Sequence, residues 1–231
     1  MPELPEAESV RLSLLPHLPG QVVASVEVRH PRVLVYPQPG AFQRQLLGER
    51  FEQLERRGKL LIFRLQRHVL MVHLGMTGQL TCRHSNRADQ PFQRHPVTGL
   101  QRTLQHPVDA HTHISLWLEN GSALHYRDIR KFGKWRLYRL EEPAWQEQLQ
   151  RRGEDPLSAG WDDELFIRQV RQSQRPIKAI LLDQKVASGV GNIYADEALF
   201  LAGIRPQARG HRLSRARLQR LSQAVPQVLR Q

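Results

Sequence analysis

Residues 114–126 have the sequence ISLWLENGSALHY. Apolar side chains occupy every second position over 114–118 and again over 124–126, which is the period of a strand with one buried face. Between them, Asn120 and Gly121 form a dipeptide typical of a type I′ hairpin turn. The stretch therefore predicts two antiparallel strands joined by a tight turn.

Further strands are expected on both sides of this hairpin. β-Branched, aromatic or alternating apolar residues recur in short segments, and many short strands separated by turn residues favour a sandwich or a barrel. The segments are 22–28, 33–36, 61–65, 68–74 and 135–138. We therefore expect a β domain over residues 1–140.

A helix is expected before these strands. Pro5 suits the first turn of a helix, where the N–H that proline lacks has no helical partner. Ala7, Val10 and Leu14 then recur on one face, and Pro16 ends the pattern.

Residues 141–231 carry a helical pattern instead. Residues 161–164 (WDDE) resemble a helix start, apolar residues line one face of 192–202, and a last helix is expected to follow Ser214. Pro226 lies inside that last helix and is expected to kink it. The fold class is therefore expected to be α+β, with an all-α second domain.

The composition indicates a polyanionic partner. The chain has 231 residues, of which 40% are hydrophobic, so a packed core is expected. Lys and Arg total 34 against 22 Asp and Glu, which gives a net charge of +12 and a pI near 10.9. Nucleic acid is the first candidate for such a chain. Charge alone does not separate an enzyme from a binding module.

One cysteine, Cys82, excludes a disulfide framework and a cysteine-rich zinc site within this chain. The opening sequence MPELPE is acidic, so no signal peptide is expected, and no apolar stretch is long enough to span a bilayer. Residues 83–113 are rich in His, Arg, Gln and Pro and show no periodicity. They are interpreted either as a basic arm beside the polyanion or, preferably, as an insertion without a role.

Pro2, with Glu3 and Glu6, is the first candidate for chemistry. Once Met1 is removed, Pro2 presents a secondary amine, and an α-amine has a reference pKa of roughly 8. It is therefore available as a neutral nucleophile near neutral pH, and the carboxyl groups beside it are placed to move protons. The alternative is ordinary helix initiation, in which proline in the first turn is followed by acids.

Lys59 follows Arg56, Arg57 and Gly58 at the edge of a predicted strand. Such a run is usually a solvated charged surface. The functional alternative is a phosphate clamp or a catalytic cation.

Two loops place exposed side chains beside glycines. Met76 lies in the segment 75–78, and Arg130 and Phe132 precede Gly133. Enzymes that act on a base must extrude it and fill the hole, and Met, Arg and Phe on rigid loops are suitable wedges. The alternative is a core Met and Phe next to turn glycines.

Residues 186–198 contain two glycines, Gly189 and Gly191, that lead directly into a predicted helix. Free N–H groups at such a junction bind phosphate. A Gly-X-Gly without a preceding strand does not predict a dinucleotide fold.

Taken in order, these segments resemble the bacterial formamidopyrimidine-DNA glycosylases, which are relatives of endonuclease VIII. The resemblance rests on residues 1–6 (MPELPE), Lys59, Met76 and its loop, residues 130–133 (RKFG) and residues 189–195 (GVGNIYA). It covers essentially the whole chain.

The resemblance implies a fold and a reaction. An N-terminal β-sandwich bracketed by the first helix would precede a helix–two-turn–helix domain, with double-stranded DNA between them. The activity would be that of a bifunctional glycosylase and abasic-site lyase of base excision repair, which excises oxidised purines and cleaves the strand by β,δ-elimination. No metal or organic cofactor would enter that chemistry.

The resemblance also implies roles for single residues. Pro2 would attack C1′ of the sugar and form a Schiff base, Glu3 would act as general acid, and Glu6 would assist proton transfers. Lys59 would contact a phosphate and support catalysis. The DNA-contacting side chains would be Met76, Arg130 and Phe132, which fill the void, with Asn192 and Lys178, which hold the backbone.

One departure concerns zinc. The family usually ends in a four-cysteine zinc finger, whereas this sequence has only Cys82 and stops at Gln231. The apolar pattern still running at the end favours truncation over a zincless member. No cofactor is therefore expected within this chain, and weaker DNA binding with impaired activity is expected.

Leu4, with the spacing of Arg130 and Phe132, resembles the branch that removes 8-oxoguanine and formamidopyrimidines. The endonuclease VIII branch, which prefers oxidised pyrimidines, usually has Gly in place of Leu4. The alternatives are a glycosylase of that second branch and a catalytically impaired fragment that binds damaged DNA. We expect a monomer in the bacterial cytoplasm, associated with the nucleoid.

Overall fold

The computed structural model describes residues 2–84 and 108–230. The chain divides into two compact units. The first unit is built from Pro2, Glu6–Arg56 and Leu60–Trp145. The second is built from Glu3–Pro5, Arg57–Lys59 and Gln146–Gln231. Two short N-terminal segments therefore belong with the C-terminal part of the chain.

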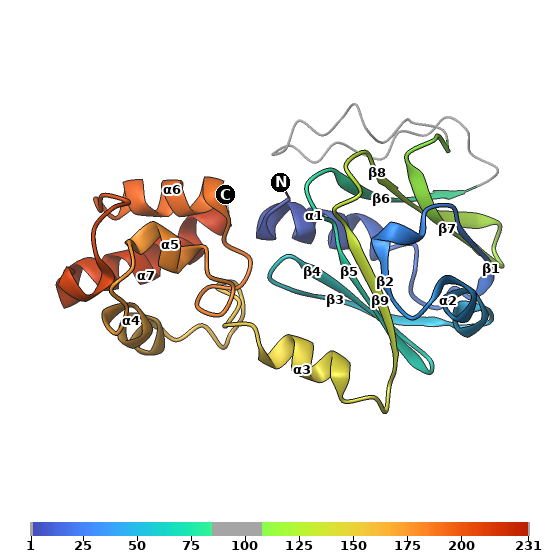
Figure 1. Ribbon diagram of the computed structural model, residues 1–231, viewed down its shortest axis with the longest axis horizontal. Coiled ribbons are helices and arrows are strands. Elements are labelled where there is room, and N and C mark those ends of the chain that lie inside the picture. The colour runs from blue at the N-terminus through green and yellow to red at the C-terminus, as the bar shows by residue number, and fades with distance from the viewer. Residues whose placement is uncertain (1, 85–107, 231) are drawn as a thin grey trace. The chain divides into compact units, whose positions relative to one another are not determined.

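The first unit contains two β-sheets (Figure 1). One has the strand order β1-β7-β8-β6, from Val23–Val28, Thr112–Leu118, Ser122–Asp128 and Gly78–His84. The other has the order β2-β9-β5-β4-β3, from Leu34–Tyr36, Lys134–Arg139, His68–His73, Leu60–Leu65 and Phe51–Arg57. β2 runs parallel to β9, whereas β9 and β4 both run antiparallel to β5.

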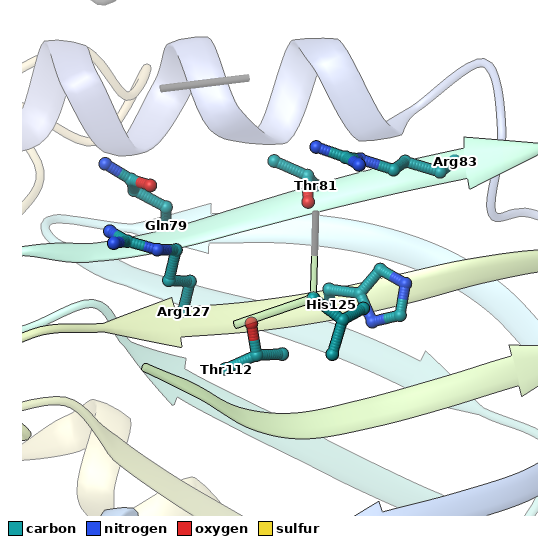
Figure 2. A pocket seen from close by; sticks show the side chains of 7 residues that line it. Gln79, Thr81, Arg83, Thr112, His125 and Arg127 are labelled. Carbon is teal, nitrogen blue, oxygen red and sulfur yellow. The ribbon is translucent and has the colours of Figure 1, made fainter. Parts of the chain in front are cut away.

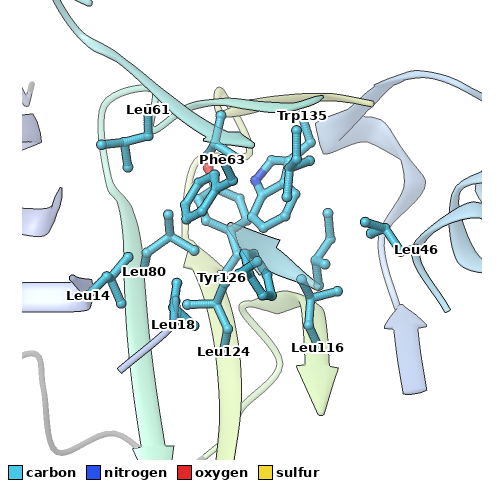
Figure 3. Packing of buried hydrophobic residues seen from close by; sticks show 14 of the residues in the cluster. Leu14, Leu18, Leu46, Leu61, Phe63, Leu80, Leu116, Leu124, Tyr126 and Trp135 are labelled. Atoms are coloured by element: carbon cyan, nitrogen blue, oxygen red, sulfur yellow. The ribbon is translucent and has the colours of Figure 1, made fainter. Parts of the chain in front are cut away.

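The two sheets share one apolar core (Figure 3). The alternation seen in the sequence places Leu116 and Leu124 of the first sheet inside, where they are fully buried with Phe63 and Trp135 of the second. The expected sandwich is therefore confirmed, because each sheet buries one face against the other.

The turn between β7 and β8 differs from the expected type I′ turn. Type I′ needs positive φ at both central residues. Here Gly121 has φ +80°, whereas Asn120 is not among the described residues with positive φ. Glu119, Asn120 and Gly121 form a three-residue loop, and the N–H of Gly121 donates to the carbonyl of Leu118. This is the pattern of a type I turn followed by a left-handed residue.

Helices α1 and α2 accompany the strands of this unit. α1 spans Leu4–Leu14, as expected, and its Leu14 belongs to the sandwich core. α2 spans Pro39–Leu46 and buries Phe42 and Leu46. The sequence interpretation missed α2, because an eight-residue helix gives only one apolar pair at helical spacing.

The segment 83–113 is shorter at both ends than expected. Arg83 and His84 belong to β6, and Thr112 begins β7. Residues 85–107, which make up most of the expected insertion, lie outside the described residues.

The second unit is helical. α3 spans Ala144–Gln150 and begins within the first unit. It is followed by α4 (Asp163–Arg171), α5 (Ile177–Leu181), α6 (Asn192–Leu201), the 3₁₀ turn η3 (Gly210–Arg212) and α7 (Arg215–Leu229). The helix start expected at residues 161–164 is confirmed, because α4 begins at Asp163 and the carboxylate of Asp162 caps it by accepting the N–H groups of Glu164 and Leu165.

α6 and α7 bury the faces that their spacing predicts. Ala195, Ala198 and Leu199 of α6 pack in one core with Leu218 and Leu221 of α7. α7 continues through Pro226, which is itself buried. Among the described residues, no helix is both long and apolar enough to cross a membrane.

Candidate active site

The carboxylate of Glu3 lies at the N-terminus of α6. Its Oε2 accepts the N–H groups of Gly191 at 2.8 Å and Tyr194 at 3.3 Å, and its Oε1 accepts that of Ile193 at 3.0 Å. Glu3 is only 2% exposed. α6 has no acid in its own first turn, so Glu3 supplies the negative charge that the unpaired N–H groups and the helix dipole favour.

Gly191 makes this approach possible. A Cβ built on Gly191 would lie 2.3 Å from Cδ of Glu3, closer than real atoms come. The neighbouring backbone is also tied to the N-terminal segment, because the N–H of Leu4 donates to the carbonyl of Gly189 at 3.1 Å. The glycines of this turn are therefore required for close packing around residues 3 and 4.

This arrangement corrects the expectation that the helix start is a free phosphate cradle. Three of its N–H groups already donate to Glu3. The sequence could not reveal this, because the acceptor comes from the other end of the chain. Asn192 is exposed at the start of α6, as is the next residue, Ile193.

Lys59 belongs to the second unit, as Glu3 does, and the preceding residue, Gly58, holds it there. The N–H of Gly58 donates to Oδ2 of the buried Asp155 at 2.9 Å, and Gly58 has φ +57°. A Cβ built on Gly189 would lie 2.9 Å from Cα of Gly58, so the two backbones are in contact. Glu3 and Lys59, which is 6% exposed, are thus carried on two short segments that pack against one turn.

Gln184 braces that turn and was not singled out in the sequence. Its Oε1 accepts the N–H of Gly189 at 2.9 Å, while its Nε2 donates to the carbonyl of Val190 at 2.9 Å. A glutamine in a helical region carries no sequence signal for such a contact. Gln184 and Asp155 are the positioning residues that the motif did not reveal.

Lys178 and Asn192 lie on one side of the helical unit. Nζ of Lys178 pairs with Oδ2 of Asp196 at 2.8 Å. Asp196 is one turn after Asn192 on α6, so the two share a helix face. The structure therefore brings Lys178 close to the exposed face that begins with Asn192.

Met76, Arg130 and Phe132 lie on two loops of the first unit. Met76 is 38% exposed and Phe132 is 51% exposed, so neither is a core residue. The guanidinium carbon of Arg130 lies 4.7 Å from the centre of the Phe132 ring, a cation–π contact. This exposure removes the alternative of buried Met and Phe beside turn glycines.

Pro2 and Glu6 also belong to the first unit, and both are partly exposed. Glu6 lies in the first turn of α1. Pro2 is bonded directly to Glu3, whose carboxylate is fixed at α6. The nine candidate residues therefore fall into two sets, one in each unit.

On the outward face of the four-stranded sheet, the described residues form a depression that is too small for a base. Gln79, Thr81, Arg83, Thr112, His125 and Arg127 line a depression there (Figure 2). Its volume is about 10 Å³, which is room for about one water molecule. Arg127 is paired with Asp109 at 2.9 Å.

A four-cysteine zinc finger does not fit the described residues. Cys82 is 1% exposed in the sandwich core. Within residues 2–84 and 108–230, no three His, Cys, Asp or Glu side chains cluster as metal ligands.

Comparison with known proteins decides the family. The model of the formamidopyrimidine-DNA glycosylase N-terminal domain matches residues 1–135, and that of the formamidopyrimidine-DNA glycosylase H2TH domain matches residues 152–231. The chain belongs to the formamidopyrimidine-DNA glycosylase family. The resemblance inferred from the motifs is thereby confirmed, and with it the enzyme class, a DNA glycosylase of base excision repair.

Curated members of the family match nearly the whole chain. The formamidopyrimidine-DNA glycosylase of Geobacillus kaustophilus is 37% identical over 226 residues, which cover 97% of this chain and 76% of that protein. That of Thiobacillus denitrificans is 39% identical over 229 residues, which cover 99% and 77%.

Solved structures of the family share the fold. The Lactococcus lactis enzyme bound to DNA with an abasic site has a TM-score of 0.84 at 29% identity, over 99% of this chain and 80% of that one. The same enzyme with DNA containing formamidopyrimidine-dG gives 0.84 at 29%, over 99% and 78%. The α+β fold class is confirmed by these matches.

Proposed function

We propose that this chain excises oxidised purines, namely 8-oxoguanine and formamidopyrimidines, from double-stranded DNA and then cleaves the strand at the abasic site. Pro2 is the nucleophile once Met1 has been removed. Glu3 and Glu6 move protons beside it, and Lys59 contacts a phosphate. The enzyme acts as a monomer on DNA in the bacterial cytoplasm.

The observation that carries the proposal is the fixation of Glu3. Three backbone N–H groups of α6 hold its carboxylate, and the residue bonded to it is Pro2. A nucleophile gains most when its position is set in advance. Ordinary helix initiation does not require an acid whose side chain is bound to a second helix.

The chemistry follows from a secondary amine. The nitrogen of Pro2 forms a bond to C1′, the N-glycosidic bond breaks, and the base leaves with the electron pair and takes up a proton. The attacking nitrogen then loses its proton and O4′ gains one as the C1′–O4′ bond of the sugar ring breaks, which gives an iminium ion, the Schiff base.

The iminium makes the C2′ hydrogen acidic. Loss of that proton expels the 3′ phosphate, and a second elimination expels the 5′ phosphate. Water hydrolyses the iminium, which releases the sugar remnant as an unsaturated aldehyde and regenerates the free amine of Pro2. The product is a one-nucleoside gap with a phosphate on each side.

The remaining candidate residues have two proposed roles, binding the DNA backbone and filling the space that an extruded base leaves. Lys178 and Asn192, on one helix face, suit the DNA backbone, because a phosphate prefers a cation and an N–H donor. Met76, Arg130 and Phe132 are exposed on loops, as required of side chains that replace an extruded base.

Borohydride trapping tests the proposal. The purified chain, with the loss of Met1 checked by mass spectrometry, is incubated with a duplex that contains 8-oxoguanine opposite cytosine and, separately, with an abasic duplex. We expect a covalent adduct on both, reduced or lost in Pro2→Gly. Pro39→Ala, at a proline that begins α2, is the matched control and should still trap.

Other outcomes identify the alternatives. Trapping on an oxidised pyrimidine in strong preference to 8-oxoguanine would assign the chain to the endonuclease VIII branch. Binding to both duplexes with no adduct on either would show a damaged-DNA-binding fragment without Schiff-base chemistry.

A further inference from the structure

Asp128, the last residue of β8, is a fully buried carboxylate to which the proposed mechanism assigns no role. Its two oxygens accept hydrogen bonds from both loops that carry Met76, Arg130 and Phe132. Buried carboxylates require such partners, because an unpaired charge inside a protein is costly. The positions of the donors show which segments the carboxylate of Asp128 holds together.

Asp128 binds the loop that carries Met76 in two ways. The hydroxyl of Thr77 donates to Oδ1 at 2.5 Å. The hydroxyl of Tyr126 lies 3.0 Å from Oδ2 and 3.1 Å from the carbonyl oxygen of Leu74, so it joins the carboxylate to the residue at which the loop begins.

Asp128 also binds the loop that carries Arg130 and Phe132. Its Oδ1 accepts the N–H of Arg130 at 3.2 Å, and its Oδ2 accepts that of Gly133 at 2.8 Å. The N–H of Arg130 also donates to the hydroxyl of Thr77 at 3.1 Å. Each carboxylate oxygen of Asp128 therefore accepts one hydrogen bond from the loop that carries Arg130 and Phe132. Its other donor is Thr77 of the Met76 loop or Tyr126, which contacts the start of that loop.

The two loops touch through their glycines. Gly75 has φ +76°, and a Cβ there would lie 2.5 Å from the nitrogen of Gly133. A Cβ on Gly133 would lie 1.5 Å from the hydroxyl oxygen of Tyr126. Both residues must be glycine for the loops to lie against each other and against the carboxylate.

We infer that Asp128 is a positioning residue, which locks the two loops into one rigid wedge, so that Met76, Arg130 and Phe132 enter the DNA duplex together. This inference rests on the proposed function. Extruding a stacked base costs a few kcal/mol. A flexible loop would move away from the DNA instead of displacing the base, so the wedge must be rigid. The carboxylate itself touches no DNA.

The test compares one lesion in two settings. Single-turnover excision is measured for 8-oxoguanine in a fully paired duplex and for 8-oxoguanine in an unpaired bubble, where the base is already unstacked. Asp128→Asn should lower the rate on the paired duplex by about 10²-fold, as expected for misplaced groups, and the rate in the bubble by less than about threefold.

Two further variants keep the inference testable if Asp128→Asn does not fold. Thr77→Val should lower the paired-duplex rate selectively, and Thr77→Ser, which restores the hydroxyl, should recover it. Asp109→Asn removes a carboxylate that pairs with Arg127 on the outward face of the sheet and should change neither rate.

An equal loss in both settings, or a Thr77→Ser variant as slow as Thr77→Val, would overturn the inference. Trapping on an abasic duplex separates this failure from that of the proposed function. If the wild-type chain traps the abasic duplex while Asp128→Asn excises at the wild-type rate from paired DNA, only the inference fails. If the wild-type chain traps nothing, the proposed function fails first.

Discussion

Oε2 of Glu3 lies 2.8 Å from the backbone nitrogen of Gly191, a residue 188 positions further along the chain. The contact joins the N-terminal segment to the start of α6 within the second unit. A candidate catalytic carboxylate is thus also the cap of a helix. Its chemical and structural roles can be separated by substitutions on either side of the contact.

Gly191→Ala is expected to abolish most of the activity although it replaces no reacting group. The added methyl carbon would lie 2.3 Å from Cδ of Glu3 and must displace it. Because small displacements of catalytic groups are costly, we expect the borohydride-trapping rate to fall by about 10²-fold.

The matched control for this variant is Gly40→Ala in α2. There the nearest atom to the new Cβ is Nη1 of Arg44 at 3.5 Å, an ordinary contact. This variant should trap at the wild-type rate and gain up to about 1 kcal/mol of stability. A Gly191→Ala chain that traps as fast as wild type would show that the position of Glu3 is not critical.

Glu3→Gln is expected to destabilise the protein. Active-site substitutions often stabilise an enzyme, because such sites are strained. Here the amide would place an NH₂ group against N–H donors of α6 and remove the charge that the helix dipole favours. We expect a loss of about 1–2 kcal/mol in the free energy of unfolding, measured by urea denaturation.

Glu164→Gln provides the comparison for that loss. Glu164 also lies in the first turn of a helix, but it is exposed and pairs with Arg215 at the surface. Such pairs contribute about 0–1 kcal/mol. A Glu3→Gln variant at least as stable as wild type would contradict the capping role.

Local patterns were sufficient to predict most elements but not their partners. Alternation over 114–118 identified β7, and apolar spacing identified α6, because each depends on neighbours in sequence. The order β1-β7-β8-β6 could not be predicted, since it depends on contacts between distant strands. The short helix α2 was missed for lack of a long enough pattern.

In the candidate site, too, the sequence identified residues but not the contacts between them. The motifs identified Glu3, Lys59 and Asn192 as residues of interest. They gave no geometry, and the helix start expected to bind phosphate turned out to hold Glu3. Asp128 stands two residues before Arg130, yet its role depends on the hydroxyl of Thr77, 51 positions away.

The stability of the protein is expected to depend on Asp128 at acidic pH. Burial acts to raise the pKa of this carboxyl, but hydrogen bonds from Thr77, Gly133, Tyr126 and Arg130 outweigh burial and lower it. The unfolded chain therefore takes up the proton first as the pH falls. The stabilisation of the folded protein by the ionised Asp128 is complete above roughly pH 4. It is lost as the pH falls through the lower pKa that this carboxyl has in the folded state.

Urea denaturation between pH 3 and 7 checks this dependence. Asp128→Asn should be less stable than wild type at neutral pH, and the difference should narrow below roughly pH 4. Thr77→Val, which loses one of the hydrogen bonds, should lie between the two. Parallel curves for wild type and Asp128→Asn would contradict the lowered pKa.

Trp161 and Pro226 are expected to be energetically coupled, although they are far apart in sequence. Pro226 has no N–H, so the carbonyl of the buried Ser222, four residues earlier in α7, lacks its helical donor. The indole Nε1 of Trp161 donates to that carbonyl at 3.2 Å. Trp161→Phe keeps an aromatic ring beside Phe166 but leaves the carbonyl unpaired, which should cost about 1–3 kcal/mol.

A double-mutant cycle tests this coupling directly. Pro226→Ala restores a backbone N–H that can donate to the carbonyl of Ser222, so the indole is no longer needed there. Trp161→Phe should therefore cost about 1 kcal/mol less in the Pro226→Ala background than in the wild-type chain. Urea denaturation of the four proteins gives the coupling energy. Strictly additive losses would mean that the indole stabilises the helical unit by packing alone. If its hydrogen bond to the carbonyl of Ser222 contributed, that contribution would change once the backbone N–H introduced by Pro226→Ala also donated to the carbonyl.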